Sequence, residues 1–127
     1  MFRVIVAGSR SIQNESLVFQ KLDTLLAEKL RAGETVQIIS GTARGIDQIG
    51  EAYAAARGLS CRRFPADWDT YGKRAGYLRN CQMAENADAL VAFWDGTSPG
   101  TKHMIEVAKD RGLEVRVVAI KTQNKKG

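Results

Sequence analysis

Two short segments place an arginine beside a glycine directly after an apolar run. In SGTARGID, Arg44 stands between Gly41 and Gly45, and in GSR, Arg10 follows Gly8. Glycine lets backbone N–H groups approach a bound anion, a helix that starts there adds the positive end of its dipole, and a guanidinium pairs with phosphate. The two segments therefore predict a site for a nucleotide or a phosphosugar. Their candidate ligand-binding residues are Gly8, Ser9, Arg10, Ser40, Gly41, Thr42, Arg44, Gly45 and Asp47.

Two of these residues have more than one possible role. Arg44 is either a phosphate ligand or a surface arginine on a tight turn, and the ligand role is favoured because Ser40, Thr42 and a helix N-terminus converge on the same spot. Asp47 either stabilises the first turn of its helix or contacts a ribose hydroxyl, and both roles stay open.

The segment at 65–80, PADWDTYGKRAGYLRN, mixes aromatic and basic residues in what we expect to be a long loop, and such loops are usually functional. Trp68 or Tyr71 is a candidate to stack on a base in a lid, although Trp68 equally fits a core aromatic. We expect at most one of Lys73 and Arg74 to contact a ligand. The candidates here are Asp67, Trp68, Tyr71, Arg79 and Asn80.

A fourth segment, the loop DGTSPGTKH, leads into a helix whose N-terminus could hold another phosphate or a sugar hydroxyl. The alternative is a plain Pro-Gly turn into that helix. The candidates are Asp95, Gly96, Ser98, Gly100 and Thr101. His103 is the only histidine and has no serine or cysteine partner at a suitable spacing, so we predict no catalytic triad, and catalytic residues stay unassigned.

Several other classes of protein lack their signatures here. The sequence has no metal-ligand cluster, Walker lysine motif or full GxGxxG, which argues against an NTPase and a dinucleotide dehydrogenase, and we expect neither metal nor cofactor. Cys61 and Cys81 match neither a disulfide framework nor a metal spacing, and we expect buried thiols in a reducing compartment. With no leader and no apolar stretch long enough to span a bilayer, the sequence predicts a cytoplasmic protein.

The basic charge is concentrated at the C-terminal end. The 127 residues carry a formal charge of +5, which falls to +2 without Lys121, Lys125 and Lys126, leaving 16 basic against 14 acidic side chains. We expect one domain at residues 1–120 and a solvated, disordered basic tail at 121–127, in preference to a nucleic-acid-binding arm.

Strands and helices alternate along the chain, and each candidate loop follows a strand and precedes a helix. Apolar runs predict strands at 2–7, 36–40, 61–64, 89–94 and 114–120, and helical periodicity predicts helices at 14–32, 46–58, 77–86 and 101–111. Nearly continuous apolar strands indicate a parallel sheet covered on both faces. We predict an α/β fold: a single Rossmann-like three-layer domain with a mostly parallel sheet of about five strands, and a ligand at their carboxyl ends.

Together these motifs resemble the SLOG superfamily of Rossmann-like nucleotide-binding proteins, within it the YspA-like branch. The resemblance runs from residue 2 to about 120 and implies a pocket for nucleotides or their derivatives, in a protein that forms a homodimer or larger assembly. The superfamily also contains the Lonely Guy phosphoribohydrolases, which release a base and ribose 5-phosphate. Pro99-Gly100-Thr101 resembles their PGGxGT loop, but Met104 stands where that family has a glutamate.

Three functions follow from these features. The first is binding of a nucleotide or a nucleotide-derived signalling ligand, as a sensor or sequestering protein, with Arg10, Arg44 and Arg79 on phosphate. The second is cleavage of the N-glycosidic bond of nucleoside 5′-monophosphates, with one of the aspartates replacing the missing glutamate. The third, nucleic-acid binding, is suggested by the sequence pI near 9.5 but is disfavoured because the charge lies in the tail.

Overall fold

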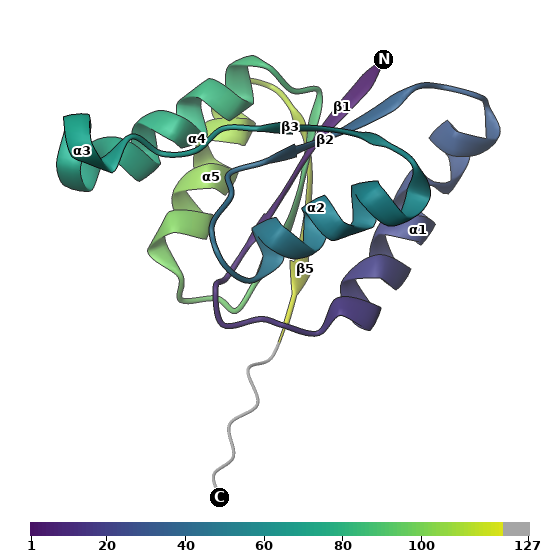
Figure 1. Cartoon of the computed structure of the whole chain (residues 1–127), viewed down its shortest axis with the longest axis horizontal. Helices are drawn as coiled ribbons and strands as arrows, with labels where there is room; N and C mark the ends of the chain where they lie inside the picture. The colour runs from purple at the N-terminus through teal and green to yellow at the C-terminus, as the bar shows by residue number, and fades with distance from the viewer. Residues whose placement is uncertain (121–127) are drawn as a thin grey trace, which may run out of the picture.

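The protein is an α/β sandwich around one parallel sheet (Figure 1). The computed structural model describes residues 1–120, so the predicted disordered tail at 121–127 lies outside the described residues. The strands are β1 (Phe2–Gly8), β2 (Val36–Ser40), β3 (Ser60–Arg63), β4 (Ala89–Trp94) and β5 (Glu114–Ala119). Their order is β3-β2-β1-β4-β5 and every pairing is parallel, which confirms the predicted Rossmann-like fold.

The two central strands are apolar on both faces, as expected for strands covered from both sides. Val4, Ile5 and Val6 of β1 are fully buried, and β4 has the burial of a core strand over most of its length. β1 pairs with β4 from Val4 opposite Ala89 to Gly8 opposite Phe93. The chain builds β2 and β3 on one side of β1, and β4 and β5 on the other, so the strand order reverses between β1 and β4.

Helices α1 (Glu15–Arg31) and α2 (Ile46–Arg57) cover one face of the sheet, and α4 (Ala75–Glu85) and α5 (Pro99–Asp110) cover the other (Figure 1). Val18, Leu22 and Leu26 of α1 recur every four residues and are buried on the first face. Asn14 caps the start of α1, where its side chain accepts a hydrogen bond from Leu17 N. Along residues 1–120, no helix combines the length and the apolar character that crossing a bilayer requires.

The prediction of a long loop after β3 was wrong. This segment folds into a four-residue helix, α3 (Trp68–Tyr71), and a 3₁₀ turn, η1 (Gly72–Arg74), which runs directly into α4. Asp67 caps α3 by accepting a hydrogen bond from Thr70 N at 3.1 Å. Such short helices contain too few residues to produce a periodic pattern. Helices α4 and α5 each begin two residues earlier than predicted.

The two thiols also differ from expectation. Cys61 on β3 and Cys81 on α4 are only half-buried, because β3 is an edge strand and Cys81 lies at the margin of its helix's packed face.

Candidate ligand-binding site

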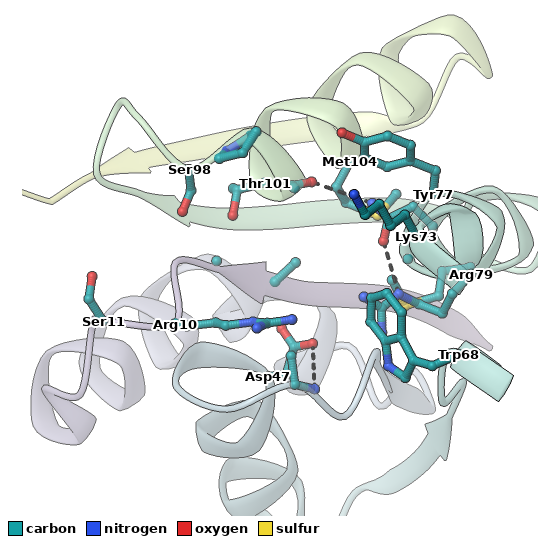
Figure 2. A pocket seen from close by; sticks show the side chains of 18 residues that line it. Arg10, Ser11, Asp47, Trp68, Lys73, Tyr77, Arg79, Ser98, Thr101 and Met104 are labelled. Carbon is teal, nitrogen blue, oxygen red and sulfur yellow. Dashed lines mark hydrogen bonds between the residues drawn. The ribbon is translucent and has the colours of Figure 1, made fainter. Parts of the chain in front are cut away.

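A cavity of about 530 Å³ opens at the carboxyl edge of the sheet, where the strand order reverses (Figure 2). Its walls come from the end of β1, the start of α2, the α3–η1–α4 segment and the start of α5. The volume suits a small organic ligand, and the position is the one at which open α/β sheets bind ligands. The residues of the predicted set that line it are Gly8, Arg10, Asp47, Trp68, Arg79, Asn80, Ser98, Gly100 and Thr101.

The end of β1 contributes Gly8 and Arg10. A Cβ on Gly8 would overlap the backbone oxygen of Phe93 and lie 2.6 Å from Cγ1 of Ile46, so only glycine fits between β4 and α2. Ser9 is buried outside the cavity, and its Oγ accepts a hydrogen bond from Asp95 N at 3.2 Å. The serine therefore ties the GSR loop after β1 to the DGTSPGTKH loop after β4, and leaves Arg10, which is exposed, beside the cavity.

Asp47 lies on the first turn of α2 and is buried while facing the cavity. Its Oδ2 accepts a hydrogen bond from Ala43 N at 3.1 Å, so it stabilises the turn before the helix. Burial raises the pKa of Asp47 to about 6, although that hydrogen bond and the charges of Arg79 and Arg10 act in the opposite direction. The carboxyl group therefore changes protonation close to neutral pH.

The other polar residues of the SGTARGID loop after β2 hold the backbone around Asp47 in place. Ser40 is fully buried, donates to Glu51 Oε2 at 2.6 Å and accepts from Thr42 N at 3.0 Å. Arg63 donates to the same Glu51 carboxylate, so this side chain is held from two strands. These contacts are structural and leave Ser40 outside the cavity lining.

The Arg79 side chain extends from α4 to the SGTARGID loop after β2. Its Nη1 donates to the carbonyl oxygen of Gly41, and its Nε donates to Asn80 Oδ1 at 3.0 Å. A Cβ on Gly41 would lie 2.6 Å from that Nη1, so the glycine makes room for the guanidinium. Burial lowers the pKa of Arg79, the nearby charge of Arg10 acts in the same direction, and Asp47 opposes both. Arg79 remains a cation, held in a fixed orientation at the cavity.

The DGTSPGTKH loop after β4 places the N-terminus of α5 at the opposite wall of the cavity. Asp95 Oδ1 accepts hydrogen bonds from Thr97 N and Ser98 N, both at 2.9 Å, and these contacts lower the pKa of Asp95. Asp95 and Gly96, which has a φ of +87°, therefore form the turn and stay out of the cavity lining. No side chain caps α5, and the N–H groups of Gly100 and Thr101 have no acceptor within the helix. This wall offers free N–H donors.

Trp68, Lys73 and Tyr77 line the remaining side of the cavity, with Tyr77 above the other two in the view of Figure 2. Trp68 is 51% exposed, so it is not the core aromatic that the sequence allowed. Figure 2 shows Arg10 extending toward Asp47, with Trp68 and Arg79 on the other side of the cavity. Sequence reasoning missed Tyr77 and gave Lys73 little weight. Lys73, Tyr77 and Asn80 are spaced four and three residues apart, which is the signal of one helical face.

Five further predicted residues do not reach the cavity. Arg44 is exposed and lines a separate shallow depression with Gln13 and Glu15. Tyr71 is 47% exposed on α3, and Asp67 caps that helix. Thr42 and Gly45 both have positive φ and shape the turn around Arg44. Across residues 1–120, no group of three or more His, Cys, Asp or Glu side chains is placed to hold a metal ion.

Comparison with known proteins gives this architecture a family. The model of the YspA, cpYpsA-related SLOG family matches residues 2–71, which include β1, the SGTARGID loop and Trp68. The Gene 61 protein of Mycobacterium phage D29 is 34% identical over 121 residues, covering 91% of this chain and 94% of the phage protein. The chain belongs to the YspA, cpYpsA-related SLOG family.

A solved structure shares the fold of this SLOG protein. DNA processing protein A (DprA) from Streptococcus pneumoniae superposes with a TM-score of 0.74 over 97% of this chain, at 18% sequence identity. The SLOG chain covers 52% of DprA, so it corresponds to about half of that protein. At this identity the likeness establishes the common fold.

Proposed function

We propose that this SLOG protein binds a nucleotide or a nucleotide-derived ligand in the cavity at the carboxyl edge of the sheet, as a sensor or a sequestering protein. The observation that carries the proposal is the convergence of Arg10 and Arg79 with the uncapped N-terminus of α5 on one cavity. Guanidinium groups and free helix N–H groups are the donors that phosphate oxygens take. The phosphate group of a bound ligand would accept hydrogen bonds from the donors of both walls.

The aromatic wall supports a base at the other end of the ligand. Half-exposed Trp68 presents a flat apolar surface beside the cationic groups, and aromatic stacking is tolerant of base identity. Asp47 lies among the cationic groups, where it would accept a hydrogen bond from a ribose hydroxyl. The cavity volume of about 530 Å³ accommodates a ligand of this size.

Calorimetric titration with adenosine 5′-monophosphate and with adenosine tests this proposal. We expect binding of the nucleotide and weaker binding of the nucleoside. Arg79→Ala removes a charge-assisted contact of about 1.5–3 kcal/mol and should lower the affinity about tenfold or more. Arg44→Ala is the matched control, because Arg44 lies in the separate depression. Equal binding of both compounds, or a loss with Arg44→Ala alone, would move the phosphate site away from the cavity.

Asp47 favours a second candidate function, hydrolysis of the N-glycosidic bond of a nucleoside 5′-monophosphate. Such a reaction adds water across the bond between base and ribose and needs a carboxylate to activate water or stabilise positive charge. Asp47 is buried at the cavity with a pKa of about 6, and α5 carries Met104 where the Lonely Guy enzymes have their glutamate. Asp47 is therefore the carboxylate that this candidate function requires.

Product analysis separates the two functions. Incubation with adenosine 5′-monophosphate should release adenine and ribose 5-phosphate if the protein is a hydrolase, and Asp47→Asn should stop release while the nucleotide still binds. Binding without product supports the sensor or sequestering role. Cytoplasmic location and self-association stay predictions from the sequence and the family resemblance.

A further inference from the structure

Three polar side chains, His103, Asn80 and Arg79, form a hydrogen-bonded chain from α5 to the wall of the cavity. Asn80 is 5% exposed, and its Oδ1 accepts the hydrogen bond from Arg79 Nε at 3.0 Å. Its Nδ2 lies 3.1 Å from Nδ1 of His103 and 3.4 Å from the carbonyl oxygen of Gly100. The Asn80 amide is therefore fixed between a residue on its own helix and a residue on α5.

The partners determine which way this amide faces and which tautomer His103 adopts. Arginine has only donors, so the atom facing Arg79 Nε must be the amide oxygen. The amide nitrogen of Asn80 then faces His103, and because it can only donate, Nδ1 of His103 must be an unprotonated acceptor. His103 is consequently neutral with its proton on Nε2. Burial lowers the pKa of His103, in agreement with the neutral ring, while Glu106 on the same helix acts in the opposite direction.

Packing holds the imidazole in this place. The ring of Tyr77, from α4, lies against His103 with 4.3 Å between ring centroids and 36° between ring planes. Tyr77 and Asn80 are one turn apart on α4, so the same helix packs against the imidazole and donates the hydrogen bond that its Nδ1 accepts.

Arg79 has two of its donors engaged in this arrangement. Nε is held by Asn80 and Nη1 by the Gly41 carbonyl, so the plane of the guanidinium is set at two points and the remaining N–H groups stay available. If Nδ1 of His103 could not accept, Asn80 Nδ2 would keep only the longer contact of 3.4 Å to the Gly100 carbonyl oxygen, and the amide that holds Arg79 Nε would be less firmly oriented. Loss of the acceptor on α5 is thereby transmitted to the cation in the cavity.

We propose that His103 is a positioning residue for the cavity: its Nδ1 orients the Asn80 amide, which holds Arg79 in the orientation that receives phosphate. The inference rests on the proposed binding of a phosphorylated ligand. His103 itself is absent from the cavity lining, so it acts through Asn80 and makes no contact of its own with the ligand.

Two substitutions separate the acceptor from the bulk of the ring. His103→Leu removes the acceptor, whereas His103→Asn returns an oxygen to the place of Nδ1, since both atoms are bonded to Cγ. With adenosine 5′-monophosphate as the probe, we expect His103→Leu to lower the affinity about tenfold and His103→Asn to bind within about threefold of the unchanged protein. Lys109→Ala, an exposed change near the far end of α5, should leave the affinity unchanged.

Nuclear magnetic resonance provides a readout that needs no ligand. In ¹⁵N-labelled protein, His103 should be the Nε2–H tautomer and the Arg79 Nε–H should exchange slowly with water. This protection should fall in His103→Leu and return in His103→Asn. Equal affinity and unchanged Arg79 protection in His103→Leu would overturn the proposal, and so would an Nδ1–H tautomer in the unchanged protein.

The two proposals fail in different ways. If the unchanged protein does not bind the nucleotide, the proposed function fails, while the Arg79 protection in the variants still decides whether His103 has a positioning role. If His103→Leu does not fold, the tautomer and the Arg79 protection of the unchanged protein decide the same question.

Discussion

Replacing Asp47 with asparagine should stabilise the protein at neutral pH. Asp47 is buried with 5% exposure, and burial raises its pKa to about 6 from an ordinary value of 3.8. Asparagine has nearly the same shape and keeps an oxygen for the hydrogen bond from Ala43 N. The substitution therefore removes the cost of a buried charge and retains the contact that shapes the turn.

The size and pH dependence follow from the two protonation equilibria. Unfolded Asp47 loses its proton near pH 3.8 and folded Asp47 near pH 6, so the free energy of unfolding falls as pH rises between these values. The difference between them corresponds to about 3 kcal/mol. We expect Asp47→Asn to be more stable by about 3 kcal/mol at pH 8, and by about 1 kcal/mol or less at pH 4.5.

Urea unfolding of both proteins across this pH range measures the difference. Asp95→Asn is a control of opposite sign, because backbone N–H groups lower the pKa of Asp95, and its charge stabilises the fold at neutral pH until the pH falls through that lowered value. Asp95→Asn should therefore be less stable than the unchanged protein at pH 8. An Asp47→Asn protein that is less stable at pH 8, or whose advantage does not change with pH, would refute the reasoning.

Further predictions concern the tight approach at β1 and the aromatic wall. Gly8→Ala should lower the free energy of unfolding by about 1–3 kcal/mol, because a Cβ there overlaps the Phe93 backbone oxygen, whereas Gly100→Ala has open space and should cost nothing measurable in urea titrations. Trp68→Ala should weaken binding of adenosine 5′-monophosphate by about 1–3 kcal/mol. In a Trp94→Phe background, fluorescence from Trp68 should be quenched as the nucleotide binds, and an unperturbed signal would contradict stacking.

The position of the candidate cavity could be predicted from the sequence, since it depends on the direction and order of the strands. Each candidate loop follows a parallel strand, and the carboxyl ends of parallel strands meet at one edge. Arg10, Arg79 and the start of α5 were therefore expected at the same edge of the sheet, and all three line the cavity there.

The direction of individual side chains could not be predicted in this way. Thr42 and Gly45 adopt positive φ, and the turn between them directs Arg44 away from the cavity. Residue types do not reveal such backbone angles. Tyr77 was missed although the predicted helix at 77–86 already placed it one turn before Asn80, because its residue type alone does not distinguish a cavity wall from a surface position.

Recovery of a ligand from a nucleotide-rich cell extract tests the central claim most directly. The purified protein is incubated with the extract and reisolated, and mass spectrometry is applied to the compounds released on denaturation and to the depleted extract. We predict that the unchanged protein releases an intact phosphorylated nucleotide derivative, and that Arg79→Ala, treated in parallel, releases much less. Absence of any nucleotide derivative from the unchanged protein, or equal recovery from Arg79→Ala, would contradict a phosphate site in this cavity.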